Sequence, residues 1–217
     1  MFIQNSMTPG PKTIGPDMLV GRAIELLKEY DFRHLPVVDE ENRLVGVVTD
    51  RDLRSAGPST VLRGEERERV LEQVRETRIR EIMSTDFVTL QPESTLDDAL
   101  FLFQTRSIGA IPVVNRSGRI MGILSLNDLM AAWSRLFGLG EMGSVLMAIE
   151  DEGDPGAPGR IVQLLAEHEI TFTRLIRTRG QGGKPAMLYV RLNTMNIRSV
   201  HRIVQEAGFT VHIPTVE

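Results

Sequence analysis

The segment LPVVDEENRLVGVVTDRD, residues 35–52, recurs as IPVVNRSGRIMGILSLND, residues 111–128. Outward from this segment, the match extends over residues 7–53 and again over residues 83–129. Every matched residue lies 76 positions after its counterpart, so one register holds across the whole repeat. One copy alone leaves a hydrophobic face uncovered, and two copies therefore predict a two-fold packed pair. Sites made in duplicate are more typical of a sensor than of an enzyme.

Each copy is predicted to contain a strand, a helix, two strands and a second helix (β-α-β-β-α). The first helix is indicated by apolar residues at the i, i+3, i+4, i+7 spacing of one helical face. These residues are Val20, Ala23, Ile24 and Leu27 in the first copy, and Leu96, Ala99, Leu100 and Phe103 in the second. The apolar runs at residues 35–39 and 44–48, with three polar residues around the turn between them, predict a buried hairpin.

The copies divide the chain into five predicted parts. Residues 1–56 hold the first copy, residues 57–78 a charged helical connector and residues 79–137 the second copy, followed by a glycine linker at 138–143 and a further domain at 144–217. The connector is interpreted as an exposed, mixed-charge helix, with a partner-docking helix as the alternative. The fold class is therefore α+β.

The last part has its own composition and its own pattern of elements. Asn196 is a candidate N-cap and Gly208 a candidate helix end, with a glycine-rich turn at 180–183. The predicted order is βαββαβ, a ferredoxin-like arrangement. Its strands are predicted at 144–150, 171–178, 186–192 and 209–213, and its helices at 160–168 and 196–206.

Composition narrows the class of protein. The net charge of −4 without a basic block argues against a nucleic-acid groove or an electrostatic membrane anchor. The chain contains no cysteine, so disulfides, thiol nucleophiles and cysteine-bound metals are excluded. No apolar run reaches the ~20 residues of a membrane span, and the start lacks the pattern of a signal peptide. A cytoplasmic protein with no nucleic-acid or membrane partner is expected, and His168, His201 and His212 lack the spacing of metal ligands.

Each copy carries a hydroxyl three positions before an acid at the end of its second hairpin strand. The residues are Thr49 and Asp52 in the first copy, and Ser125 and Asp128 in the second. An ionised carboxylate can accept two hydrogen bonds, which suits the vicinal hydroxyls of a ribose. A hydroxyl beside a helix N-terminus suits a phosphate. The alternative is that each acid only caps its helix. The duplication of the hydroxyl–acid pair at matching positions favours a binding role.

The residues before Pro36 and Pro112 distinguish the two copies. A proline restricts the preceding residue to extended geometry, which can expose backbone groups to the edge of a purine. The first copy has Arg33, His34 and Leu35 before its proline, and the second has Gly109, Ala110 and Ile111. Arg51 is likewise replaced by Asn127. The first site is expected to favour phosphates, and the second to bind anions more weakly or to hold a nucleoside-like ligand.

On these duplicated motifs, over residues 4–133, the sequence resembles the CBS-domain pair, or Bateman module. The resemblance implies clefts between the copies that bind adenosine-containing ligands, namely AMP, ADP, ATP or S-adenosylmethionine. These are regulatory ligands, and no cofactor is required. It also implies that Asp52 and Asp128 hold ribose hydroxyls, and that Thr13 and Thr89 contact the ligand bound to the opposite copy. The implied first site is Arg33, His34, Leu35, Pro36, Thr49, Arg51, Asp52 and Thr89. The implied second site is Thr13, Gly109, Ala110, Ile111, Pro112, Ser125, Asn127 and Asp128.

The C-terminal part resembles the ACT-like regulatory domains at Pro158-Gly159, at the start of its first predicted helix. That family binds amino acids at paired interfaces, which implies an amino-acid ligand and a homodimer, with a purely dimerising domain as the alternative. Where the family has an acid two residues before the proline, this chain has Gly156, and Asp154 lies upstream. A CBS pair followed by an ACT-like domain is similar in architecture to the acetoin-utilisation regulatory proteins.

The leading hypothesis is a non-enzymatic sensor of adenosine-containing ligands that signals to a protein target through dimer geometry. A nucleotide-acting enzyme is the rival, but the sequence has no P-loop, no nucleophile elbow and no carboxylate cluster suited to magnesium. A scaffold protein with empty clefts is the third reading.

Overall fold

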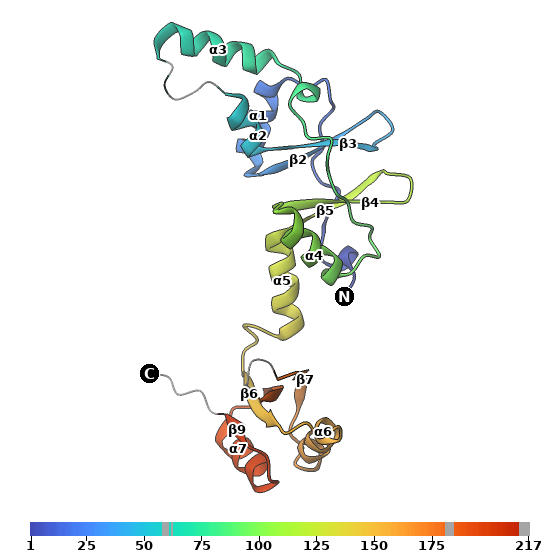
Figure 1. Cartoon of the computed structure of the whole chain (residues 1–217), viewed down its shortest axis with the longest axis vertical. Helices are drawn as coiled ribbons and strands as arrows, with labels where there is room; N and C mark the ends of the chain where they lie inside the picture. Colours follow the sequence, from blue (N-terminus) through green and yellow to red (C-terminus); the bar gives the residue numbers. More distant parts are fainter. Residues whose placement is uncertain (58–60, 62, 181–184, 213–217) are drawn as a thin grey trace. The chain divides into compact units, whose positions relative to one another are not determined.

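A computed structural model describes residues 1–57, 61, 63–180 and 185–212. The chain divides into two compact units, Met1–Ala132 and Trp133–Glu217, and each is described by itself. Figure 1 shows the order of the helices and strands of this α+β protein. Among the described residues, no helix combines the length and the apolar character needed to cross a bilayer.

The first unit contains the repeat as two copies of the same structure. The first copy consists of α1 (Val20–Tyr30), β2 (His34–Val38), β3 (Leu44–Thr49) and α2 (Asp50–Ala56). The second consists of α4 (Leu96–Arg106), β4 (Ala110–Val114), β5 (Ile120–Ser125) and α5 (Leu126–Phe137). Both hairpins are antiparallel and share one register, including a bulge before Val38 and before Val114. The predicted helix, hairpin and second helix of each copy are confirmed.

The strand predicted to open each copy is much shorter than expected. It consists of a single parallel bridge, Ile14 to Val37 in the first copy and Leu90 to Val113 in the second. Prolines explain the difference, because Pro16 and Pro92 follow two residues later and have no N–H to donate to a ladder.

The first residues of each copy pack against the other copy. The 3₁₀ turn Ile3–Asn5 and β1 (Thr8–Pro9) lie along the second copy, where Thr8 pairs with Ile123 of β5. The 3₁₀ turn Ile79–Glu81 lies along the first copy, and Ile79 is fully buried in that copy's core. Each hydrophobic core is therefore completed by residues from the other half of the repeat.

Two glycines lie where the first residues of one copy pack closely on the hairpin of the other. A Cβ atom on Gly46 would lie 2.5 Å from Met83 Sδ, and one on Gly122 would lie 2.5 Å from Met7 Sδ. The hairpin turns also meet, because Leu44 N–H donates to Gly118 O at 3.0 Å. The two copies thus form one body with an internal two-fold relation.

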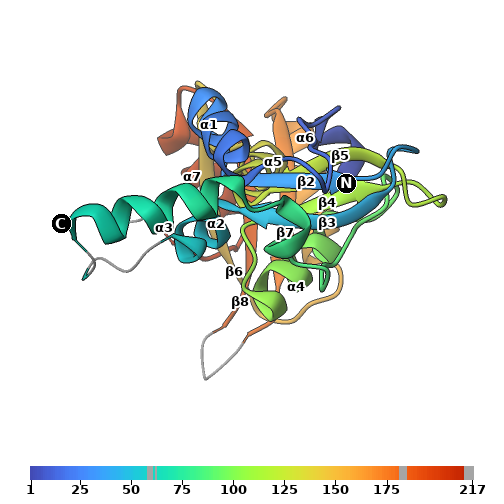
Figure 2. The ribbon, with the colours of Figure 1, turned by 90° about the horizontal axis from the view of Figure 1, so that it is seen from above.

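The connector forms α3 (Gly64–Glu76), the helix predicted within residues 57–78. It packs along α1, as both views show (Figure 1 and Figure 2). Val74 reaches the core of the first copy, and the other residues of the helix are exposed or half-buried. Val74 of the connector therefore contributes to the fold of its own chain.

The second unit is a four-stranded antiparallel sheet with two helices, in the predicted βαββαβ order. The sheet has the strand order β7-β8-β6-β9, and its core is formed by the inner sheet face and both helices. Asn196 Oδ1 caps α7 by accepting from Ser199 N–H at 3.2 Å. Residues 181–183 of the predicted glycine turn and Ile213 of the last predicted strand lie outside the described residues. The elements are β6 (Ser144–Asp151), α6 (Ala157–Glu167), β7 (Phe172–Thr178), β8 (Ala186–Asn193), α7 (Ile197–Glu206) and β9 (Val211–His212).

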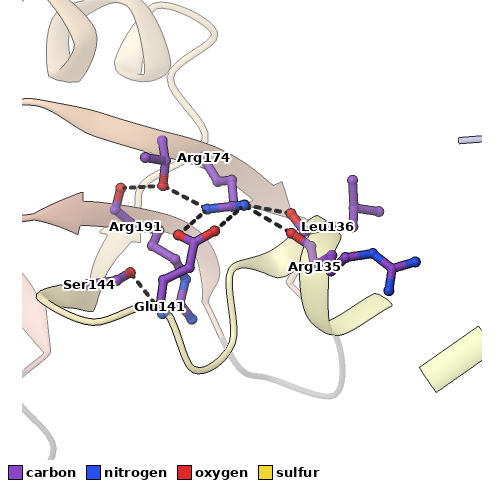
Figure 3. Close-up of polar contacts among 7 residues, drawn as sticks. Arg135, Leu136, Glu141, Ser144, Arg174 and Arg191 are labelled. Atoms are coloured by element: carbon purple, nitrogen blue, oxygen red, sulfur yellow. Dashed lines mark hydrogen bonds and ion pairs between the residues drawn. The ribbon is translucent and has the colours of Figure 1, made fainter. Parts of the chain in front are cut away.

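One arginine of β7 fastens the end of α5 to this sheet (Figure 3). The Arg174 guanidinium donates hydrogen bonds to the carbonyl oxygens of Arg135 and Leu136, at 2.9 and 2.6 Å. These two carbonyl groups in the last turn of α5 therefore have hydrogen-bond donors. Arg174 also makes a bidentate ion pair with Glu141, at 2.8 Å for both contacts. Gly138, with φ of +66°, lies so close to Arg174 that a side chain there would collide with the guanidinium. The helix end and the following turn are thereby held in one conformation.

Replacing Gly46 or Gly122 by alanine is expected to lower the free energy of unfolding by ~1–3 kcal/mol, because the added methyl group overlaps a methionine and nearby backbone. Urea unfolding monitored by circular dichroism measures the change. Gly15→Ala is the matched control, since no atom lies within 4 Å of a Cβ added there. Equal losses in the control and in the two test variants would contradict the close approach.

Arg174→Met is expected to cost ~1–3 kcal/mol, because it leaves carbonyls of α5 without donors and Glu141 without its partner. Thermal unfolding of this variant is compared with that of Arg198→Met, which removes an exposed arginine from α7. If Arg174→Met and Arg198→Met both unfold at the same temperature as the original protein, Arg174 does not stabilise the end of α5.

Candidate ligand-binding cleft

A cleft of about 630 Å³ lies within the first unit, between the two copies. Its lining comes from the start of β2 and the β3–α2 junction of the first copy, and from the end of α4 and the start of β4 of the second. The segment 84–88, near the start of the second copy, packs on the first copy and contributes a further wall. The lining residues are Arg33, His34, Val47, Thr49, Asp50, Arg51, Asp52, Arg54, Ser84, Asp86, Phe87, Val88, Arg106, Ser107, Ile108, Gly109, Ala110 and Pro112.

The Asp52 carboxylate is oriented by the helix that it caps. Its Oδ2 accepts from the Thr49 N–H at 2.8 Å and from the Thr49 hydroxyl at 2.7 Å. In return, Thr49 Oγ1 accepts from the Asp52 N–H at 3.2 Å, which completes a capping box. Among the described residues, no hydrogen bond reaches Asp52 Oδ1. The carboxylate is therefore fixed in place and keeps one oxygen available as an acceptor.

The second copy repeats this arrangement. Asp128 Oδ2 accepts from the Ser125 N–H at 2.8 Å and from the Ser125 hydroxyl at 2.6 Å. Asp52 and Asp128 therefore both cap their helices, which is the alternative role predicted for them from the sequence. Capping uses one carboxylate oxygen of each residue and leaves the other able to accept a hydrogen bond from a ligand.

His34 lines the cleft and lies against Gly109 of the second copy. A Cβ atom on Gly109 would lie 2.9 Å from His34 Cε1, so only glycine gives the ring this space. Burial lowers the pKa of His34 below its ordinary value of 6.5, the charge of Arg33 lowers it further, and Asp52 opposes both. The imidazole is thus held in the neutral form at pH 7.

The cleft carries positive charge that has no protein partner. Arg54 pairs with Asp50 one turn earlier on α2. Within the described part of the chain, Arg33, Arg51 and Arg106 make no ion pair, although all three line the cleft. Three guanidinium groups around one space can bind an anion with several oxygens, such as a phosphate.

The structure brings most of the first predicted site together. Arg33, His34, Thr49, Arg51 and Asp52 all line the cleft. Leu35 and Pro36 are buried and do not line it, because β2 is covered on both faces. Thr89 lies beside the lining residue Val88.

The second predicted site is divided by the structure. Gly109, Ala110 and Pro112 line the same cleft as the first site. Ile111 is fully buried. Thr13, Ser125, Asn127 and Asp128 do not belong to this lining. Ser125, Asn127 and Asp128 are the counterparts of the lining residues Thr49, Arg51 and Asp52, whereas Thr13 is the counterpart of Thr89.

Several lining residues escape prediction from sequence. Arg106 ends α4, and its counterpart in the first copy is Tyr30, so alignment of the copies gives no indication of a cation there. Ser84, Asp86 and Phe87 reach the cleft only because their segment crosses to the first copy. The expectation that Thr89 contacts a ligand bound to the opposite copy was the one sequence signal for this wall.

The described residues contain no group of three or more histidine, aspartate or glutamate side chains arranged to hold a metal ion. The polar groups of the cleft are the carboxylates of Asp50, Asp52 and Asp86, hydroxyl groups, a neutral imidazole and guanidinium donors.

The family model for the CBS domain matches residues 3–59 and 79–135. A CBS domain-containing protein of Dictyostelium discoideum is 32% identical over 130 residues, which cover 60% of this chain and 89% of that protein. The inosine-5′-monophosphate dehydrogenase of Aquifex aeolicus is 30% identical over 128 residues. That match covers 58% of this chain but only 23% of the dehydrogenase.

Solved structures resemble the chain over a similar share of its length. AcuB from Vibrio cholerae is 28% identical with a TM-score of 0.54, over 65% of this chain and 96% of that one. CBSX2 in complex with AMP is 26% identical with a TM-score of 0.53, over 63% and 98%. The CBS domain pair of protein MJ0100, in complex with 5′-methylthioadenosine and S-adenosyl-L-methionine, is 27% identical with a TM-score of 0.50, over 64% and 96%.

The lowered pKa of His34 predicts a pH-dependent stability. The unfolded chain takes up a proton near pH 6.5 while the folded protein resists it, so the free energy of unfolding should fall as the pH drops below 6.5. Above that value, the ring is neutral in both states and its contribution is complete. NMR titration of the His34 ring should give a pKa below 6.5, and His34→Gln should flatten the stability profile. A His34 pKa at or above 6.5 would sink this prediction.

Proposed function

The chain belongs to the CBS-domain family, and on this premise we propose that it is a non-enzymatic regulatory protein whose cleft binds an adenosine-containing ligand. The observation that carries the proposal is the combination in one cleft of a fixed acceptor, Asp52, with three unpaired guanidinium groups. The cleft volume of about 630 Å³ lies within the ~300–1,000 Å³ of small-molecule sites.

Each part of a nucleotide has a counterpart in this lining. Asp52 Oδ1 is placed to accept from a ribose hydroxyl, while Oδ2 stays bonded to Thr49. Arg33, Arg51 and Arg106 supply donors to phosphate oxygens. Phe87 is half-buried and offers an apolar wall to a purine. We assign the phosphate-bearing ligand, AMP, ADP or ATP, to this first cleft.

The comparisons support the class of ligand. CBSX2 is a relative of this fold that holds AMP, and the MJ0100 domain pair holds 5′-methylthioadenosine and S-adenosyl-L-methionine. All three molecules contain adenosine and differ at its 5′ substituent. The arginines of the first cleft favour the phosphate among these substituents.

A regulatory role fits the extent of the matches better than an enzymatic one. The match covers about a quarter of the dehydrogenase, and the CBS domains make up about half of this chain. The chain spans most of AcuB and of the Dictyostelium CBS-domain protein. A scaffold protein with an empty cleft is the remaining alternative, and the three unpaired arginines disfavour it, because like charges gathered without a partner repel one another.

Signalling would follow if the ligand binds one relative orientation of the two copies more tightly than another. A ligand that contacts both copies favours one relative orientation of them, and a micromolar ligand supplies about 8 kcal/mol at standard state. Helix α5 follows the Ser125–Asp128 capping pair, and its last carbonyl groups accept hydrogen bonds from Arg174, so the chain passes directly from the second copy into the C-terminal unit.

We assign the C-terminal unit an ACT-like role, as a homodimerising module that presents the signal to a protein target. An amino-acid ligand is the alternative role. It is less favoured, because the Asp154 carboxylate near the start of α6 already binds Gly156 N–H and Arg160. The likeness to AcuB makes acetoin utilisation the first pathway to test.

Isothermal titration with AMP, ATP and S-adenosylmethionine tests the proposal, with product analysis as a check for turnover. Binding without turnover is expected, and Asp52→Ala should weaken nucleotide binding by ~1.5–3 kcal/mol, the value of a charge-assisted hydrogen bond. Asp128→Ala, the same change at the matching position, is the control and should weaken it far less. Equal losses would contradict the difference between the clefts, hydrolysis would support an enzyme, and no heat with any ligand would support a scaffold.

A further inference from the structure

The sheet of the C-terminal unit has its two helices on one face only. Val190 and Leu192 of β8 are fully buried in the core that this face forms with α6 and α7. Successive residues of a strand point to opposite faces, so the residues next to them point to the other, outer face. On the three longest strands, the outer-face residues are Leu146, Ala148, Glu150, Arg174, Ile176, Met187, Tyr189 and Arg191. None of these belongs to the core cluster of the unit.

The middle of the outer face is apolar and aromatic. The register places Ile176 of β7 opposite Tyr189 of β8, and Tyr189 opposite Ala148 of β6. These three side chains are partly exposed, and Leu146, two residues before Ala148, is 44% exposed. An apolar surface that is continuous across three strands is typical of a sheet that packs on a second sheet.

Positive charge at one end of the outer face lacks a carboxylate. Arg174 and Arg191 lie opposite each other on neighbouring strands, and the turn at Gly138 adjoins both (Figure 3). Glu141 pairs with Arg174; its pKa is lowered mainly by the hydrogen bonds from Arg174 and also by the charge of Arg191. Arg191 is only 8% exposed, and in the described part of the chain its guanidinium donates only to Ser144 Oγ, at 3.3 Å. A buried guanidinium without an ion pair is costly, so a further carboxylate would stabilise it.

The same face carries an acid at its other end. Leu146 is the register partner of Arg191, and Glu150 lies four residues further along β6. Its contact with His212, at 3.2 Å, leaves the carboxylate partly exposed. When two such faces meet, a two-fold axis that runs across the strands brings the cationic end of one copy over the acidic end of the other. An axis along the strands would bring arginine over arginine, which is unfavourable.

We infer that two copies of the chain dimerise through this outer face, with each Arg191 facing Glu150 of the partner subunit. A second copy is the occupant, because the face is complementary to itself: apolar in the middle, with an excess cation at one end and an acid at the other. The two sheets would stack ~10 Å apart. This inference rests on the proposed homodimerising role of the C-terminal unit and names the surface that carries it.

Cross-linking of the full chain tests the surface. The chain contains no cysteine, so an introduced cysteine is its only thiol. Ile176→Cys places this thiol in the middle of the face, where the axis brings it opposite its own counterpart. Because sheets ~10 Å apart are too far for a disulfide, a short bismaleimide joins the thiols, and a denaturing gel shows the product. Val162→Cys is the matched control, since Val162 is 36% exposed on α6, on the helical side of the sheet. Only Ile176→Cys should give a cross-linked dimer.

Reversal of charge tests the pairing of Arg191. In the Ile176→Cys chain, Glu150→Lys should raise the protein concentration for half-maximal cross-linking at least ~10-fold, because it places a second cation against Arg191. Glu150→Gln, which keeps the shape of the side chain, should change it in the same direction. Glu152→Lys makes the same charge change at an exposed position after β6, and it should alter this concentration less than ~3-fold. Circular dichroism checks that every variant is folded.

The inference is overturned if Val162→Cys cross-links as well as or better than Ile176→Cys, or if Glu150→Lys and Glu152→Lys have equal effects. A chain that sediments as a dimer without a cross-link at Ile176→Cys also overturns it, and leaves the homodimerising role intact. A chain that sediments as a monomer at every concentration overturns the homodimerising role itself. The two failures are therefore distinguished.

Discussion

The cleft depends on a pair of backbone hydrogen bonds between residues that belong to different copies of the repeat. Val47 N–H donates to Ser84 O at 3.0 Å, and Ser84 N–H donates to Val47 O at 2.9 Å. This pairing carries the segment 84–88 across to the first copy, where it walls the cleft. The glycine at position 46 permits the approach, since a side chain there would overlap Met83. Without the exchange, each copy would present an open hairpin face and no enclosed space.

The helix cap gives the cleft its fixed acceptor. A carboxylate on a free side chain would have to be ordered when a ligand binds, which costs affinity. Asp52 is already ordered by Thr49 through Oδ2, so its other oxygen is placed before the ligand arrives. Capping and binding are thus compatible uses of one carboxylate. This explains how an ordinary capping box recurs at both matching positions without excluding a site.

The sequence was sufficient to predict the helix, hairpin and second helix of each copy and five residues that line the cleft, because register and capping are local properties. It was insufficient where distant segments meet. The pattern of the repeat is the same whichever copy the leading segment packs on, so Phe87 could not be placed at the cleft. Arg106 could not be found because its position is filled by Tyr30 in the other copy. Leu35 and Ile111 were assigned to sites on the evidence of their neighbours, yet both are fully buried, since these strands are covered on both faces.

The positions that differ between the copies are those where a change costs little stability. Gly46 and Gly122 approach a methionine in the same way, and both copies keep them. The wall residues Arg51 and Arg106 are exposed, and substitutions at exposed positions seldom alter stability by more than ~0.5 kcal/mol. Charge at the walls can therefore change while the fold and the capped acceptor persist. Likeness of fold therefore describes the framework that the two copies share, and the chemistry of the cleft has to be argued from its own wall residues.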